Sequence, residues 1–296
     1  MSIFLTGGSG FIGSAVLSRL TSTGRKVRAL ARSDASAAAI EAAGGVAVRG
    51  EITDVDLLAR EAAASEGVIH TAATSTAADA DHDAALLDAV LPALAGKPYV
   101  HTSGVWIHGD GDAITEQSPF APPPVTSWRL PLDARVRAAA DDGVRSIVIA
   151  PGIVYGKGTG LPGLVKDGPT ADDALLYPGG DQHWTTVHVD DLAELYVLAF
   201  DAAPAGSYYL GVSGDNPLVR DIARAASHAR GLDGRVAPEP EDASRDRLGP
   251  LYDAFALDQQ ATGAHARDLG WVPTGPTLVD DLTTGSYADD VPDSGA

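Results

Sequence analysis

The residues with the clearest chemical use are three glycines near the N-terminus. Gly7, Gly10 and Gly13 follow a short apolar run over residues 2–5, and apolar residues at helical spacing come after them. A strand that enters a helix through a glycine turn lets the backbone approach a pyrophosphate closely, and the free N–H groups at the helix start meet its negative charge. Because both flanking elements are predicted, the pattern indicates a dinucleotide site rather than a tight turn alone.

The composition limits the classes of protein and of partner. The chain has 296 residues, 45% of them apolar, which is enough for one large domain or one domain with a lobe. No run of about 18 apolar residues predicts a membrane span, and the first strand starts too early for a secretory leader, so we expect a cytoplasmic protein. The net charge of −19 argues against nucleic acid and membrane as partners, and the absence of cysteine excludes disulfides, thiolate metal sites and a cysteine nucleophile.

Strands and helices alternate along the chain, which predicts an α/β fold with a Rossmann-type doubly wound parallel sheet. The predicted strands cover residues 2–5, 26–31, 46–48, 67–73, 99–102, 146–150 and 207–212. The predicted helices include 35–43, 56–64, 132–140, 191–200 and 219–229, and the proline-rich segment 110–131 is expected to be an irregular loop over a site. We expect a dinucleotide-binding core over 1–155, a smaller interleaved C-terminal substrate lobe over 156–287, with 185–215 returning to the core, and a tail over 288–296.

Several ordered motifs resemble one known family over nearly the whole chain. They are residues 6–13, 50–54, 68–73, 102–109, 151–156, 187–193 and 269–273. In this order the motifs are similar to those of the extended short-chain dehydrogenase/reductases, also called the NAD-dependent epimerase/dehydratase family. The resemblance implies that cofactor contacts come from Gly7, Ser9, Gly10, Phe11, Ile12, Gly13, Glu51, Ile52, Thr71, Ala72, Ala73, Thr102, Arg129, Pro151, Ile153 and Val154.

The end of the second predicted strand bears on the choice of nucleotide. In the family, an acid at this position accepts hydrogen bonds from the ribose hydroxyls of NAD, whereas an arginine pairs with the 2′-phosphate of NADP. Here Ala31 stands at the acid position and is followed by Arg32 and Ser33. A guanidinium beside a hydroxyl suits a phosphate, so we predict NADP(H), although Asp34 is close and a solvated arginine is the alternative.

The family's usual catalytic pair is missing. That pair is a tyrosine with a lysine four residues later, and none of the eight tyrosines is followed in this way. By local resemblance Val125 and Arg129 occupy the two positions, with Asp133 standing for a common helix acid; counting without gaps places Trp128 at the tyrosine position instead. Gly104 stands where a serine is usual, and Ser103 comes one residue early. Ordinary carbonyl reduction by the family mechanism is therefore not expected.

Other side chains are candidates for the missing acid. Ser103, His108, Tyr155 and His183 lie in segments expected near the nicotinamide or the substrate, and a histidine of near-neutral pKa is a competent acid. His108 on a loop is equally consistent with a structural role, and core packing is the alternative for Tyr155. No spacing of histidines or carboxylates is convincing for a metal site.

These observations predict an NADP(H)-dependent oxidoreductase that uses a non-standard proton donor. Its hydride acceptor would be a polarised C=O, C=N or conjugated C=C, and Trp106, Trp128 and Trp184 are expected to line an apolar pocket for a small or cyclic organic substrate. A homodimer is compatible with the sequence. Two alternatives remain: a redox-inactive NADP-binding sensor or partner-binding protein, and an epimerase or dehydratase of the sugar-nucleotide type.

Overall fold

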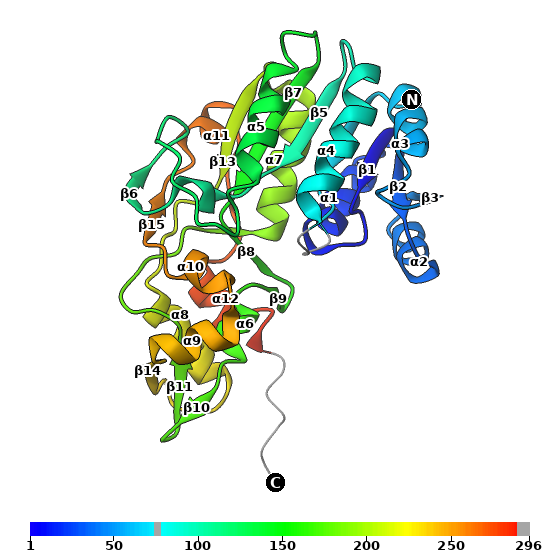
Figure 1. The fold of residues 1–296 in the computed structure, drawn as a ribbon. Coiled ribbons are helices and arrows are strands. Elements are labelled where there is room, and N and C mark those ends of the chain that lie inside the picture. The colour runs from blue at the N-terminus through cyan, green and yellow to red at the C-terminus, as the bar shows by residue number, and fades with distance from the viewer. Residues whose placement is uncertain (74–77, 289–296) are drawn as a thin grey trace.

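The computed structural model describes residues 1–73 and 78–288. Its centre is a seven-stranded parallel sheet with the strand order β13-β7-β5-β4-β1-β2-β3 (Figure 1). These strands are β1 (Ile3–Thr6), β2 (Val27–Ala31), β3 (Val46–Arg49), β4 (Gly67–His70), β5 (Pro98–Thr102), β7 (Arg145–Pro151) and β13 (Ser207–Gly211). The predicted doubly wound sheet is confirmed.

Helices cover both faces of this sheet, as the apolar runs of its strands require. One face packs against α1 (Phe11–Ser22), α2 (Asp34–Ala42), α7 (Val189–Ala202) and α11 (Ala264–Asp268). The other face packs against α3 (Val55–Ala64), α4 (Asp79–Val90), η1 (Leu91–Ala93), η2 (Val105–His108) and α5 (Arg129–Ala138). All seven strands pair in parallel, so every strand ends at the same edge of the sheet. The helices that connect neighbouring strands run back in the opposite direction.

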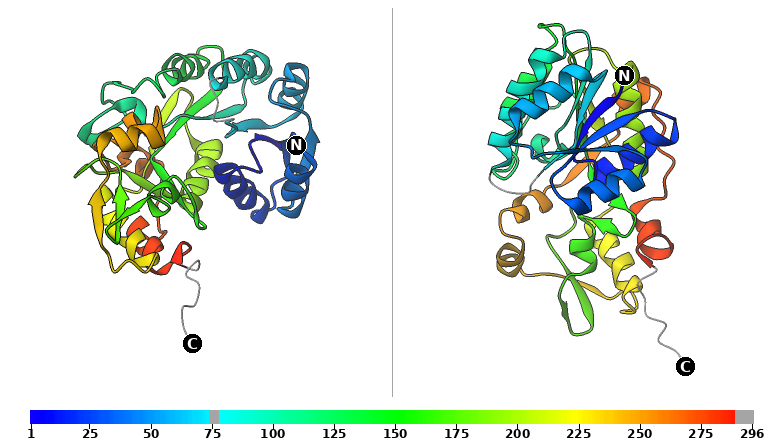
Figure 2. Two further views of the ribbon diagram at one scale, coloured as in Figure 1. Left: turned by 60° about the horizontal axis from the view of Figure 1, so that its bottom comes forward. Right: turned by 90° about the vertical axis from the view of Figure 1, so that its right-hand side faces the viewer.

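A smaller lobe lies beneath this edge and has its own apolar core (Figures 1 and 2). Its strands are β8 (Ile153–Gly156), β9 (Thr159–Gly160), β10 (Thr170–Ala171), β11 (Ala174–Tyr177), β12 (Thr186–His188) and β14 (Val236–Pro238). Its helices are α6 (Gly163–Lys166), α8 (Val219–Ala229), α9 (Glu241–Leu248), α10 (Leu251–Phe255) and α12 (Leu278–Thr284). The lobe therefore closes over the edge that carries the glycine turn.

Three local features differ from the sequence predictions. The expected loop 110–131 contains β6 (Gly111–Ile114), which pairs with β15 (Gln259–Ala261), a partner too distant in sequence for local patterns to indicate. α5 begins at Arg129 rather than Leu132, and β4 ends at His70 rather than residue 73. Within 185–215, α7 and β13 join the central layers, whereas β12 pairs with β8 outside the central sheet.

The predicted division into core, lobe and tail stays a prediction. Nearly all of the expected tail, residues 289–296, lies outside the described residues. No helix in the described ranges is long and apolar enough to cross a bilayer.

Candidate functional site

The glycine turn packs too tightly for larger residues. Gly7 has a φ of +78°, and its carbonyl oxygen accepts a hydrogen bond from the Gly10 N–H at 2.8 Å. A Cβ on Gly13 would lie 2.0 Å from the same carbonyl oxygen. α1 starts after Gly10 with neither a side-chain cap nor an acid in its first turn, so its first N–H groups remain available to an anion.

A cavity of about 900 Å³ runs from this turn along the carboxyl edge of the sheet. Twelve of the residues predicted to hold the cofactor line it together: Gly7, Ser9, Gly10, Phe11, Ile12, Arg32, Glu51, Ile52, Thr71, Ala72, Ala73 and Val154. Six predicted residues do not line it: Gly13, Ser33, Thr102, Arg129, Pro151 and Ile153. The sequence did not indicate Leu30, Ser36, Gly50, Thr53, His82, Gly152, Gly160 and Leu161, although Gly50, Thr53 and Gly152 belong to the family motifs.

The end of the cavity beside β2 has one exposed arginine. Arg32 lines the cavity and forms no ion pair with any other described residue. Asp34, its acidic neighbour, pairs instead with Arg49 at 2.8 Å. The Ser33 and Ser36 side chains form a capping box at the start of α2: the Ser33 hydroxyl accepts the Ser36 N–H at 3.1 Å, and the Ser36 hydroxyl donates to the Ser33 carbonyl oxygen at 2.9 Å. Of the two serines, Ser36 lines the cavity.

A buried polar network lies where β5 ends. The Ser103 hydroxyl donates to Asp133 Oδ2 at 2.5 Å, and both side chains are buried. Asp133 Oδ1 has no hydrogen-bond partner among the described residues, although His101 Nε2 lies 3.7 Å away. Burial raises the pKa of Asp133 to about 6, and burial lowers the pKa of His101 to about 3. Burial thus disfavours the charged form of both groups, the carboxylate of Asp133 and the imidazolium of His101.

Arg129 is held against the same strand end. Its Nη1 donates to the Thr102 carbonyl oxygen at 3.1 Å, and its guanidinium lies 4.4 Å from the centre of the Trp128 ring. The Tyr196 hydroxyl lies 2.6 Å from Thr102 Oγ1, whose own proton goes to the His70 carbonyl oxygen. Arginine keeps its charge even though burial lowers the pKa of Arg129, so it supplies a fixed cation beside β5.

Two of the proposed proton donors are held in internal hydrogen bonds. His108 Nε2 pairs with the Tyr208 hydroxyl at 2.9 Å, and burial lowers the pKa of His108. The Tyr155 hydroxyl donates to the Pro276 carbonyl oxygen at 2.5 Å, and burial raises the pKa of Tyr155. Neither side chain lines the cavity, and the same is true of Ser103 and Asp133. A catalytic role for His108 or Tyr155 stays a prediction.

His183 and Trp184 lie farther into the lobe. His183 Nδ1 is 2.9 Å from Asp258 Oδ1, and the ring is partly exposed. The prediction that Trp184 lines a substrate pocket is wrong: its ring is 2% exposed, stacks on Phe255 and donates its N–H to the Phe255 carbonyl oxygen. Phe255 is too distant in sequence for the local pattern to reveal this packing.

Trp106 and Trp128 are only partly buried. Trp106 packs edge-on against Phe255, and the Trp128 N–H donates to the Val125 carbonyl oxygen. Between their segments and the strand end, Gly104 has extended backbone and open space, since a Cβ there would meet nothing within 4 Å. No side chain of the described part of the chain therefore fills the position where the family carries serine.

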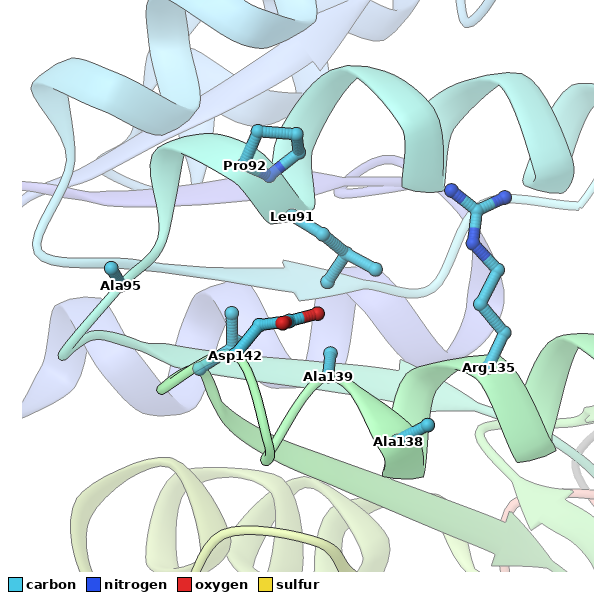
Figure 3. Close-up of a pocket in the computed structure, with 8 residues that line it drawn as sticks. Leu91, Pro92, Ala95, Arg135, Ala138, Ala139 and Asp142 are labelled. Carbon is cyan, nitrogen blue, oxygen red and sulfur yellow. The ribbon is translucent and has the colours of Figure 1, made fainter.

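A second cavity, of about 500 Å³, is separate from this site. Figure 3 shows it between the end of α4 and the end of α5, lined by Leu91, Pro92, Ala95, Arg135, Ala138, Ala139, Asp142 and Val144. Because these helices run against the strands, their ends mark the opposite edge of the sheet from the glycine turn. No cluster of three or more potential metal ligands occurs in residues 1–73 and 78–288.

Sequence comparisons find relatives of this chain. Residues 3–211 match the NAD dependent epimerase/dehydratase family. An uncharacterized protein of Schizosaccharomyces pombe is 31% identical over 298 residues, covering 97% of this chain and 100% of the relative. The 4-hydroxy-2-methyl-3-oxo-4-farnesyl-3,4-dihydroquinoline-1-oxide ketoreductase of Stigmatella aurantiaca is 28% identical over 263 residues, covering 83% of this chain and 78% of the relative.

Solved structures share the fold over the full chain. A double mutant of the dTDP-glucose 4,6-dehydratase of Streptomyces venezuelae, with NAD bound, superposes with a TM-score of 0.78 and 22% identity. The match covers 98% of this chain and 97% of that one. At this identity the likeness concerns the fold and not the substrate.

Proposed function

Because the chain belongs to the NAD dependent epimerase/dehydratase family, we propose that it is an NADP(H)-dependent reductase that transfers a hydride to a carbonyl carbon of a small or cyclic organic substrate. The single observation that carries the proposal is the cavity along the carboxyl edge of the sheet, which brings together the glycine turn and Arg32. A bound nicotinamide would supply the hydride; the remaining steps depend on this chain's own residues.

Arg32 supports NADP(H) over NAD(H). It is an exposed arginine on the cavity wall with no ion-pair partner among the described residues, and Ser36 stands near it on the same wall. Its acidic neighbour Asp34 is engaged with Arg49, which reduces the repulsion that a 2′-phosphate would meet. A free guanidinium with a hydroxyl nearby is the donor set that a phosphate monoester prefers.

The carbonyl acceptor is supported by the similarity to a ketoreductase and by the polar groups that end β5. The N–H groups at the start of α1 would bind the pyrophosphate, and the cation of Arg129 would oppose negative charge that develops on a substrate oxygen. Trp106 and Trp128, both partly buried, would offer an apolar surface to a ring.

The test is NADPH consumption by the purified protein with a panel of ketones, imines and conjugated enones. We expect turnover with at least one ketone, and NADPH bound more tightly than NADH. Equal dissociation constants for the two nucleotides would contradict the choice of NADP(H). Reduction of imines or enones with no ketone turned over would contradict the carbonyl acceptor.

A redox-inactive NADP-binding sensor is the second candidate, because the tyrosine–lysine pair is absent. Tight NADPH binding with no turnover of any panel member would favour it. Conversion of a sugar nucleotide without net consumption of NADPH would favour an epimerase or dehydratase instead.

A further inference from the structure

The end of β5 holds a buried acid that no arginine or lysine neutralises directly. Asp133 on α5 is 4% exposed, and in the described ranges its one neighbour at ion-pair distance is His101, 3.7 Å away. One carboxylate oxygen accepts the Ser103 hydroxyl, and the other has no hydrogen-bond partner there. A buried carboxyl oxygen without a partner is costly when ionised, so such a group is kept where function needs it.

We propose that Ser103 and Asp133 together replace the missing tyrosine–lysine pair: the Ser103 hydroxyl meets the substrate oxygen, and Asp133 supplies and takes back the proton. This inference rests on the proposed function and names the acid–base group of that same site. Asp133 does not touch the substrate: it positions the Ser103 hydroxyl and exchanges a proton with it.

The position of Ser103 suits this role. It follows β5 directly at the carboxyl edge of the sheet, is buried just outside the set of residues that line the cofactor cavity, and its main-chain N–H donates to the Ile149 carbonyl oxygen at 2.7 Å. The next residue, Gly104, leaves open space where a side chain would otherwise stand. The guanidinium of Arg129 donates to the carbonyl oxygen of Thr102, the residue before Ser103, so a cation lies close to Ser103. A substrate oxygen that entered this space would have both a proton donor and a positive charge beside it.

The proton and electron balance closes within the site. In reduction, the hydride forms the new C–H bond and the π electron pair of the carbonyl moves to its oxygen, which takes the Ser103 hydroxyl proton. When Asp133 is protonated, its O–H donates to the Ser103 oxygen, the reverse of the hydrogen bond that the carboxylate accepts. The Ser103 oxygen takes this proton, which leaves a carboxylate and a neutral serine, and the carboxylate regains a proton from solvent before the next reduction. In alcohol oxidation the same proton moves back, and NADP⁺ accepts the hydride.

The groups that face Asp133 set the pH at which it works. They are Ser103 and His101 from the β5 segment, Asp83 from α4, Arg129 and Arg137 from α5, and Tyr99 and Tyr208 from β5 and β13. Burial is the largest influence and raises the pKa of Asp133 to about 6. Reduction needs the acid and should quicken as the pH falls through this value, whereas alcohol oxidation needs the carboxylate and should quicken as the pH rises through it.

The first experiment compares Ser103→Ala and Asp133→Asn with the control Ser146→Ala. Ser146 is a fully buried serine at the start of β7, on the opposite edge of the sheet, and its hydroxyl has no hydrogen-bond partner within residues 1–73 and 78–288. We expect Ser103→Ala and Asp133→Asn to slow hydride transfer in single turnover by about 100-fold or more. Their dissociation constants for NADPH should stay within about twofold of the parent, and Ser146→Ala should match the parent in both. Asp133→Asn should also remove the pH dependence of the rate, which a purely structural role would leave in place.

The second experiment reads the carboxyl group without turnover. Infrared difference spectra of the protein alone should contain a protonated carboxyl band that titrates near pH 6, is absent in Asp133→Asn, shifts in Ser103→Ala and is unchanged in Ser146→Ala. Absence of that band, or a band insensitive to Ser103→Ala, overturns the proposal. If the parent reduces a substrate and both variants keep the parent's rate and pH profile, the proposed role of Ser103 and Asp133 is wrong while the proposed function stands. A parent that binds NADPH and reduces nothing overturns the proposed function, and the role of the pair with it.

Discussion

At the scale of single residues, the proposed preference for NADPH over NADH rests on Arg32. Removing its guanidinium in Arg32→Ala should weaken NADPH binding by about 10- to 150-fold, since hydrogen bonds to a charged group are worth about 1.5–3 kcal/mol. NADH, which lacks the 2′-phosphate, should lose little affinity. Titration of intrinsic fluorescence with each nucleotide measures both constants. Arg60→Ala, an exposed arginine on α3, is the matched control; an equal loss for NADH and NADPH would show that Arg32 does not contact the phosphate.

At the scale of elements, the glycine turn that connects β1 to α1 shapes the surface proposed to bind the nucleotide. In Gly13→Ala the new methyl would overlap the Gly7 carbonyl oxygen, so the turn must open and α1 must shift. We expect the free energy of unfolding to fall by about 1–3 kcal/mol and NADPH affinity to fall by about 10-fold or more. Gly163→Ala at the start of α6, where a Cβ meets nothing within 4 Å, is the control. Retention of parent-like NADPH affinity in Gly13→Ala would mean that the turn does not form the binding surface.

At the scale of the whole molecule, one carboxylate on α7 joins the central layers to the C-terminal segment. Asp191 accepts the N–H groups of Thr274 and Gly275, each at 2.9 Å, and its carbonyl oxygen accepts the Trp271 indole N–H at 2.8 Å. That segment continues into α12, which belongs to the core of the lobe. These hydrogen bonds, of which the Trp271 bond is buried and the other two are partly buried, tie the C-terminal segment to α7.

Asp191→Ala leaves two main-chain donors without an acceptor and should lower the free energy of unfolding by about 2–4 kcal/mol. Its neighbour Asp190 pairs with Lys157 at 2.7 Å, but both side chains are about half exposed, so Asp190→Ala should cost at most about 1 kcal/mol. Urea denaturation of both variants gives the comparison. Similar losses in the two variants would show that the Asp191 contacts do not hold the segment.

The features that the sequence predicts correctly depend on neighbours in the chain. The glycine turn needs residues 2–20 only, because the strand, the turn and the helix follow one another. Parallel strands with intervening helices leave few arrangements, so the doubly wound sheet followed from alternation alone. The position of Arg32 followed in the same way, from its place directly after the second strand.

Features that depend on distant segments were decided by the tertiary structure. Ser103 and Asp133 are separated by 30 residues and meet only because α5 packs beside the end of β5. The sequence raised Ser103 as a candidate but gave no reason to pair it with Asp133, whose raised pKa comes from burial. The glycine-rich surroundings of Trp184 predict a contact with substrate, whereas in the structure Phe255 stacks on its ring. Local order along the chain thus determined the fold and the cofactor edge, while the acid–base chemistry depends on burial and on contacts that only packing creates.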